Sequence, residues 1–240
     1  MTELQGLRVV IVGGGTGMGK ATARLLAERG SEVVIGGRRA EVLDEASAGL
    51  PIHKHTIDVA DRSGTQNFIQ WATETLGHID VFMNAAGINI KTRSMAEMSP
   101  EQWDQVLAVN ATGAYNCLHA VLPKMRERKE GLILNVTSVA GKRAIALGGI
   151  AYSASKFAMT SLGTCVANEV AEDGIRITNI YPGEVNTPLL EKRPAPVSDE
   201  RKQRMLQPED VAEAIVSLIA LPKAVHIPEL VIKPLSQGWY

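Results

Sequence analysis

The stretch LRVVIVGGGTGMGKATARLL, residues 7–26, joins an apolar run to a glycine-rich turn and then to an amphipathic pattern. Val9 to Val12 are all β-branched, which is typical of a strand buried on both faces. The glycines at 13, 14, 15, 17 and 19 permit tight turns and close approach of another group. From Lys20 onward, apolar residues recur at spacings of three and four, which predicts a helix. A strand, a glycine turn and a helix in this order predict a phosphate-binding unit of a parallel α/β sheet.

The rest of the chain repeats this alternation of short β-branched runs and longer amphipathic segments. It predicts an α/β Rossmann fold as one domain over residues 1–240, with a doubly wound, parallel seven-stranded sheet and helices on both faces. The expected strands lie at 7–12, 33–35, 53–57, 81–83, 132–136, 176–180 and 230–232, and the expected helices at 19–29, 63–76, 100–125, 152–172 and 208–220. Residues 188–207 fit neither pattern because prolines stand at 188, 194 and 196, so we expect a mobile surface excursion there.

The composition is that of a soluble globular protein, with 45% hydrophobic residues and 25 basic against 26 acidic residues. The charges are mixed along the chain, so nothing favours a nucleic-acid partner. Residues 1–7 lack the features of a signal peptide, and no apolar run approaches the ~20 residues that span a bilayer. We therefore expect a cytoplasmic protein with no membrane association. Cys117 and Cys165 lie in helical apolar patterns, which predicts buried free thiols.

The glycine turn in its strand-to-helix setting predicts a dinucleotide site, since a pyrophosphate can bind the N–H groups at the helix N-terminus. An acidic residue normally ends the second strand when the adenosine ribose carries a free 2′-hydroxyl. Here Gly36 and Gly37 are followed by Arg38 and Arg39, which favours the 2′-phosphate of NADP over NAD. The alternative is that both arginines merely end the strand in solvent.

The next two strands end in residues suited to the same cofactor. Asp58 and Val59 follow the third strand, where the carboxylate could accept the amine of adenine or could instead cap a helix. The fourth strand ends in Asn84, Ala85, Ala86 and Gly87, whose small side chains would let a cofactor lie close to the backbone.

Tyr152 and Lys156 stand four residues apart in a helical segment, so both side chains project from one helical face. Ser138 stands upstream at the end of an apolar run. Such residues are, singly, more often structural than catalytic. Together they indicate proton-transfer chemistry on one bound molecule.

With these residues in place, the chain resembles the short-chain dehydrogenase/reductase family over nearly its whole length. The family motif TGxxxGxG falls on Val12 to Gly19, and NNAG falls within Met83 to Gly87. Val12 and Met83 depart from the family's usual residues at positions that mainly support packing between strands. The catalytic Asn, Ser and YxxxK of the family and its PG turn fall on Asn110, Ser138, Tyr152 to Lys156, and Pro182 with Gly183.

The resemblance implies roles for these residues. Tyr152 would be the general acid or base, Ser138 would orient the substrate oxygen, and Asn110 would hold a water of a proton relay. Lys156 would bind the nicotinamide ribose, and its charge ~4 Å away would supply the ~4 kcal/mol that brings the tyrosine pKa from ~10 to ~7. The expected cofactor contacts are Gly13, Gly15, Thr16, Gly17, Met18, Gly19, Arg38, Arg39, Asp58, Val59, Asn84, Ala85, Gly87, Tyr152, Lys156, Pro182, Gly183, Val185 and Thr187.

The predicted function is therefore an NADP-dependent interconversion of a secondary alcohol and a carbonyl compound, with NADPH as the reduced cofactor. A 3-oxoacyl thioester reductase is the enzymatic alternative, and a non-catalytic dinucleotide-binding sensor or a structural assembly protein are alternatives of other classes. The five histidines have no metal-binding spacing with cysteine or carboxylate, so we expect no metal.

The substrate is a small molecule whose identity the sequence leaves open. Ala140 and the run from Ala144 to Leu147 suggest a mainly apolar wall. The basic residues of the excursion could attract an anionic substrate or could belong to a solvated lid; they are Lys192, Arg193, Arg201, Lys202 and Arg204.

The resemblance also implies a homotetramer or homodimer paired through the segments at 100–125 and 152–172. Small residues in the second segment would permit close contact between helices, or could face their own sheet; they are Ala158, Ser161, Ala167 and Ala171.

Overall fold

The computed structural model describes residues 4–238, in which seven parallel strands form one sheet in the order β3-β2-β1-β4-β5-β6-β7. The predicted Rossmann fold is confirmed. The strands are β1 Arg8–Val12, β2 Glu32–Gly37, β3 Ile52–Thr56, β4 Val81–Asn84, β5 Gly131–Val136, β6 Ile175–Pro182 and β7 Glu229–Ile232. The α-helices are α1 Gly17–Glu28, α2 Ala40–Ser47, α3 Arg62–Leu76, α4 Pro100–Leu107, α5 Gly113–Arg128, α6 Ile150–Val170, α7 Asp199–Gln203 and α8 Pro208–Ile219.

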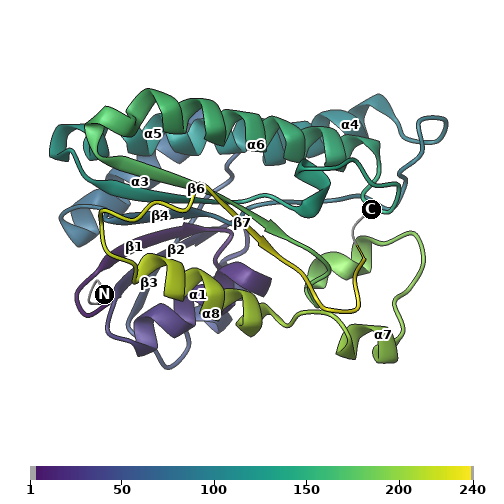
Figure 1. Ribbon diagram of the computed structural model, residues 1–240, viewed down its shortest axis with the longest axis horizontal. Helices are drawn as coiled ribbons and strands as arrows, with labels where there is room; N and C mark the ends of the chain where they lie inside the picture. Colours follow the sequence, from purple (N-terminus) through teal and green to yellow (C-terminus); the bar gives the residue numbers. More distant parts are fainter. Residues whose placement is uncertain (1–3, 239–240) are drawn as a thin grey trace.

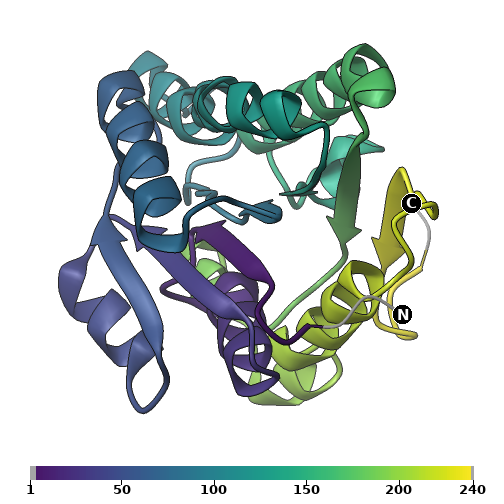
Figure 2. The same cartoon turned by 90° about the vertical axis from the view of Figure 1, so that its left-hand side faces the viewer.

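Two layers of helices enclose the sheet (Figure 1 and Figure 2). Successive side chains of β1 alternate between them, because strand side chains have a period of two. Val9 and Ile11 pack with α1, α2 and α8, whereas Val10 and Val12 pack with α3 and α5. All four valine and isoleucine side chains are fully buried, which explains why this run shows no polar alternation.

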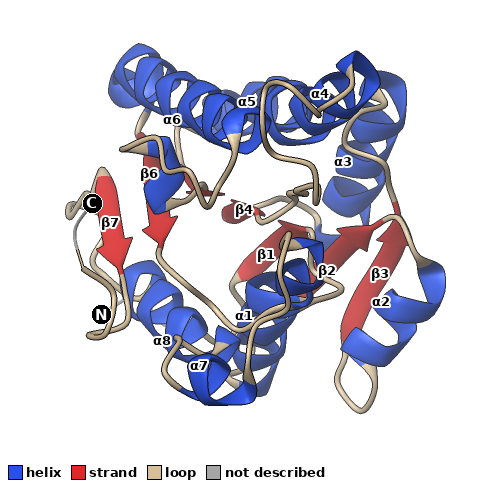
Figure 3. Cartoon of the chain, turned by 90° about the vertical axis from the view of Figure 1, so that its right-hand side faces the viewer, coloured by secondary structure: helices blue, strands red, loops and turns tan. Residues whose placement is uncertain are grey.

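The order of the strands reverses its direction of growth between β1 and β4. Strands β2 and β3 extend the sheet to one side of β1, and strands β4 to β7 extend it to the other side. Figure 3 shows the side of the molecule where the strands end and the loops that follow them gather. Ligands of open α/β sheets bind in the crevice at such a point, outside the carboxyl ends of the strands.

The structure corrects four sequence-based expectations. The helix expected at 100–125 is interrupted by a π-helical turn, Ala108–Thr112, between α4 and α5. Helix α2 was not predicted. The strand β3 is an edge strand with four exposed residues, so it is not buried on both faces. Cys117 is buried as expected, but Cys165 is exposed on α6.

The excursion at 188–207 contains regular structure. A 3₁₀ helix, Pro188–Lys192, opens it, and α7 follows. Leu206 then pairs with the segment after β6, since its N–H donates to the Glu184 carbonyl and its own carbonyl accepts from Asn186. Within residues 4–238, none of the helices has both the length and the apolar character needed to cross a bilayer.

Candidate active site

The glycine loop fills the crevice at the ends of β1, β2 and β4. Gly13 has a φ of +76°, and a Cβ added there would lie 2.6 Å from the Ala85 carbonyl carbon. A Cβ on Gly19 would lie 2.3 Å from the Gly13 oxygen. These contacts leave no space for side chains and fix the N-terminus of α1 at the crevice.

The first turn of α1 is suited to an anion. Thr16 occupies the N-cap position without a capping bond from its side chain, and the turn carries no acidic residue. The free N–H groups and the helix dipole therefore favour a negatively charged group at this point. A pyrophosphate fits this arrangement.

Arg38 and Arg39 follow the end of β2 and are both exposed. Within residues 4–238 neither guanidinium forms a hydrogen bond or an ion pair. Asp58, after β3, accepts from the N–H of Ala60 at 3.0 Å, and the cap of α3 is Asp61 instead. The alternative that Asp58 caps this helix is therefore wrong. Its neighbour Val59 is buried beneath α5.

The end of β4 brings the cofactor and catalytic candidates together. Asn84 is buried and accepts from the N–H of Ala86 at 3.3 Å. A Cβ on Gly87 would lie 3.3 Å from Lys156 Nζ and 3.6 Å from Asn110 Oδ1. The absence of a side chain on Gly87 thus leaves the space beside both groups open.

Asn110 lies in the π-helical turn, a local geometry that often marks functional sites. Its Oδ1 accepts from the N–H of Ile88 at 2.8 Å. Its Nδ2 donates to the Ile88 carbonyl at 2.9 Å and to Ser155 Oγ at 3.0 Å. The amide therefore ties the segment after β4 to helix α6. If Asn110 binds a water, as expected from the sequence, the water would donate to the remaining lone pair of Oδ1.

Ser138 ends the extended segment after β5, and its Oγ accepts from the N–H of Ala140 at 3.1 Å. Helix α6 starts directly after Gly149, whose φ is +82°, and one of its turns carries both Tyr152 and Lys156. Ser138 and Tyr152 both line the pocket, and the Ser138 hydroxyl acts to lower the pKa of the Tyr152 phenol. Lys156 Nζ lies 5.8 Å from the centroid of the Tyr152 ring.

Lys156 is almost fully buried and donates to the Val136 carbonyl at 3.0 Å. Its Nζ also lies 3.7 Å from Met159 Sδ. An ammonium has three donors, so one remains able to bind a hydroxyl group such as those of a ribose. Because burial disfavours the charged form, the pKa of Lys156 falls from 10.5 to about 8.

The Tyr152 pKa is raised above 10.0 in the protein by itself. Burial of the phenol is the largest cause, and it outweighs the hydrogen bond from Ser138 and the charge of Arg93, which act in the opposite direction. The prediction that Lys156 lowers the Tyr152 pKa towards 7 is therefore wrong for the protein by itself. The phenol holds its proton, as a proton donor must.

The turn after β6 completes the crevice. The N–H of Gly183 donates to the Ile232 carbonyl at 2.8 Å, and the N–H of Glu184 donates to Gln237 Oε1 at 2.8 Å. Val185 is buried. Thr187 lies beside the glycine loop, because a Cβ on Gly17 would be 3.0 Å from its methyl carbon.

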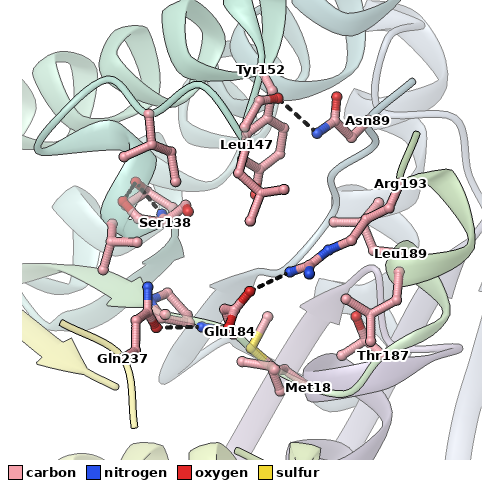
Figure 4. A pocket seen from close by; sticks show the side chains of 18 of the residues that line it. Met18, Asn89, Ser138, Leu147, Tyr152, Glu184, Thr187, Leu189, Arg193 and Gln237 are labelled. Atoms are coloured by element: carbon pink, nitrogen blue, oxygen red, sulfur yellow. Dashed lines mark hydrogen bonds and ion pairs between the residues drawn. The ribbon is translucent and has the colours of Figure 1, made fainter. Parts of the chain in front are cut away.

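A pocket with about 750 Å³ of empty space, part of it open to solvent, lies between these elements. In Figure 4, Tyr152 and Leu147 lie across the pocket from Met18 and Thr187. Its lining comprises Met18, Asn89, Arg93, Thr137, Ser138, Val139, Ile145, Leu147, Gly148, Tyr152, Pro182, Gly183, Glu184, Val185, Thr187, Leu189, Leu190, Arg193 and Gln237.

The sequence model of the short chain dehydrogenase family matches residues 8–197. The chain belongs to this family. An uncharacterised oxidoreductase of Staphylococcus haemolyticus is 30% identical over 237 residues, which cover 98% of this chain and 100% of that protein. The protein is accordingly a short-chain oxidoreductase with a Rossmann fold.

Two solved structures of short-chain dehydrogenases illustrate the likeness. The alcohol dehydrogenase of the archaeon Thermococcus sibiricus, complexed with 5-hydroxy-NADP, has a TM-score of 0.86 and 28% identity, covering 98% of this chain and 99% of that one. The closed form of a serine dehydrogenase complexed with NADP+ has a TM-score of 0.87 and 28% identity, covering 96% of each chain.

Sequence reasoning missed five polar residues of the pocket, Asn89, Arg93, Thr137, Glu184 and Gln237. Asn89 and Arg93 belong to the segment between β4 and α4, which has no periodic pattern. Glu184 directly follows the predicted PG turn, so its position was a usable signal. Gln237 reaches the pocket only because the chain returns to it after β7, and no local pattern reveals that contact.

The structure gives no support to a metal site. Among residues 4–238, no group of three or more His, Cys, Asp or Glu side chains is arranged to hold a metal ion. Four of the histidines take part in local contacts: His55, His78, His119 and His226. His55, for example, packs against Trp71 with ring centroids 4.8 Å apart.

Proposed function

We propose that the protein catalyses the NADP-dependent interconversion of a secondary alcohol and a ketone or aldehyde. The observation that carries the proposal is the position of Ser138 and Tyr152 in one pocket beside the glycine loop, with Lys156 Nζ 5.8 Å from the centroid of the Tyr152 ring. Two structural neighbours are complexed with NADP or its 5-hydroxy derivative, which supports NADP as the cofactor. The unpartnered, exposed Arg38 and Arg39 suit a 2′-phosphate.

Each residue of the site has a separate role in the proposed reaction. When bound, NADPH supplies a hydride to the carbonyl carbon, and the carbonyl oxygen must gain a proton. Tyr152 donates that proton, and Ser138 donates a hydrogen bond that orients the same oxygen. Lys156 holds the ribose and places positive charge near the phenolate left by the transfer. In the reverse reaction Tyr152 accepts the proton of the alcohol.

Asn110 acts as a positioning residue in this scheme. Its bonds to Ile88 and Ser155 hold the end of β4 against α6, the helix that carries Tyr152 and Lys156. A water held at its free lone pair would connect Lys156 with solvent. Tyr152 could then regain its proton after each turnover.

A substrate screen monitored by the loss of NADPH absorbance tests the proposal. Ketones, aldehydes and 3-oxoacyl thioesters belong in the screen. Tyr152→Phe should retain NADPH binding and lose about 10²- to 10⁴-fold in turnover, the usual contribution of a general acid. Thr75→Val is the control, because it removes an exposed hydroxyl on α3 that does not line the pocket, and it should leave turnover unchanged. If Tyr152→Phe stays within tenfold of wild type, the assignment of the proton donor fails.

We also propose that the chain forms a homodimer or homotetramer through α5 and α6. Tyr115 and Phe157 are each 42% exposed on these helices. Ala158 and Ser161 are exposed on α6 as well and would permit close contact. Ala167 instead packs against the core of its own chain.

A further inference from the structure

Arg93 lines the pocket and joins three segments of the chain. Its Nε donates to the Ile90 carbonyl at 3.0 Å, and its Nη2 donates to the Lys192 carbonyl at 2.8 Å. Its Nη1 donates to the carbonyl of Leu147. A guanidinium has five N–H groups, so one remains on each terminal nitrogen. Two N–H groups are what a carboxylate accepts in a bidentate pair.

The charge of Arg93 is not balanced by a carboxylate. All three of its partners are neutral carbonyl groups, and no ion pair involves it within residues 4–238. The residue is half-buried, and burial lowers its pKa together with the nearby charge of Arg193. A partly buried cation is costly unless an anion pairs with it.

A second guanidinium adds to this positive charge. Arg193 crosses the pocket to Glu184 at 2.8 Å, as Figure 4 shows, and both side chains are largely buried. Glu184 is shared, because Arg201 also bonds to its Oε1 at 2.9 Å. Three guanidiniums, including Arg93, thus stand against one carboxylate, and the group carries a net positive charge.

Arg93 lies on the substrate side of the pocket. It bonds to Leu147 and packs against Gly149, just before the start of α6. Figure 4 places Leu147 and Tyr152 opposite Met18, the residue of the glycine loop in the pocket. An anion that reached Arg93 would therefore belong to the molecule beside Tyr152 rather than to a pyrophosphate at the glycine loop.

We propose that the substrate is an oxo acid, or the corresponding hydroxy acid, and that Arg93 binds its carboxylate. Arg193 adds positive charge to the same end of the pocket. This inference rests on the proposed carbonyl reduction and names its substrate class. Of the basic residues that the sequence left open, only Arg193 lines the pocket.

Matched pairs of ketones test the inference directly. The probes are 2-oxobutanoate, 3-oxobutanoate and 4-oxopentanoate, each beside its methyl ester, with 2-butanone as a neutral ketone and dihydroxyacetone phosphate as a phosphate monoester. Esterification removes the charge and keeps the reacting carbonyl. We expect at least one acid to exceed its ester by about tenfold or more in kcat/KM, mainly through KM.

The variants assign the effect to its residue. Arg93→Gln should lower kcat/KM for the preferred acid by about tenfold to a hundredfold and leave its ester within about threefold. Arg204→Gln is the control, because Arg204 is an exposed arginine of the excursion at 188–207 that does not line the pocket. If Arg93→Gln does not fold, Arg93→Lys replaces it, with a smaller loss that is again confined to the acid.

Several results would overturn the inference. Arg93 only joins loops if wild-type protein reduces the esters as efficiently as the acids. The same conclusion follows if Arg93→Gln lowers kcat/KM equally for an acid and its ester. A tenfold loss of NADPH binding in Arg93→Gln would show that it serves the cofactor. If the enzyme prefers dihydroxyacetone phosphate to every oxo acid, the group that Arg93 binds is a phosphate and not a carboxylate. In these cases carbonyl reduction itself stands. No turnover of any oxo acid in the panel would also overturn the inference, whereas no turnover of any compound in the broader substrate screen would refute the proposed function as well.

Discussion

Replacing Lys156 with methionine should destroy activity and yet stabilise the protein in the absence of nucleotide. The ammonium is buried, and its pKa is lowered from 10.5 to about 8. At ~1.4 kcal/mol per pKa unit, keeping this group charged at pH 7 costs about 3 kcal/mol of folding free energy. Methionine has a similar unbranched shape and no charge.

The net gain is smaller than the full penalty. Lys156→Met also removes the hydrogen bond to the Val136 carbonyl, which contributes about 1 kcal/mol. We therefore expect the free energy of unfolding at pH 7 to rise by about 2 kcal/mol. For a chain of this size, that gain corresponds to a Tm increase of roughly 4 to 8 °C.

The pH dependence of the stability difference distinguishes removal of the buried Lys156 charge from a general effect of packing. Between pH 8 and 10.5 the unfolded chain holds a proton on Lys156 that the folded chain has lost. Wild-type stability therefore rises with pH through this window relative to the variant, and the advantage of Lys156→Met shrinks. Below pH 8 the advantage is complete.

Thermal or urea unfolding at pH 7 and pH 10 makes the measurement. Lys124→Met is the control, because Lys124 is exposed on α5 and pairs with Glu127 on the surface. Its effect should be small at both pH values. The reasoning is refuted if Lys156→Met melts below wild type at pH 7, or if its advantage is the same at pH 10.

Two further predictions concern the cofactor and the assembly. Arg38→Asp should weaken NADPH binding far more than NADH binding, because it replaces the cation expected to hold the 2′-phosphate with an anion; dissociation constants from fluorescence titration decide, and wild-type protein that prefers NADH by a wide margin contradicts the argument. Phe157→Glu should reduce the oligomer to smaller species in size-exclusion chromatography with light scattering, because it buries a charge in the proposed helix interface; a wild-type monomer rules that interface out.

The sheet was predictable because its strands are short, β-branched and bounded by turn residues. The pattern failed where tertiary position decides the outcome. The HKH run of β3 is polar because this strand lies at an edge of the sheet, and periodicity alone does not reveal an edge. The π-helical turn at Ala108–Thr112 keeps helical spacing on both sides, so the sequence reads as one continuous helix.

The candidate site also contains some residues that were predictable from the sequence and others that were not. Ser138, Tyr152 and Lys156 stand at a strand end and on a helix, where spacing along the chain gives their relative positions. The charge of the pocket depends on Arg93 and Arg193, which come from irregular segments. Their guanidiniums reach it only through contacts with distant carbonyl and carboxylate groups.

The contact between Gly13 and Ala85 also bears on how the chain is made. The glycine loop follows the first strand, yet the backbone that closes it lies 72 residues further along. At a synthesis rate of about 5 to 20 residues per second, that partner emerges roughly 4 to 14 s later. The nucleotide-binding loop is therefore synthesised early and completed late, and during this interval β1 can pair with β2 but lacks its neighbour β4 on the other edge.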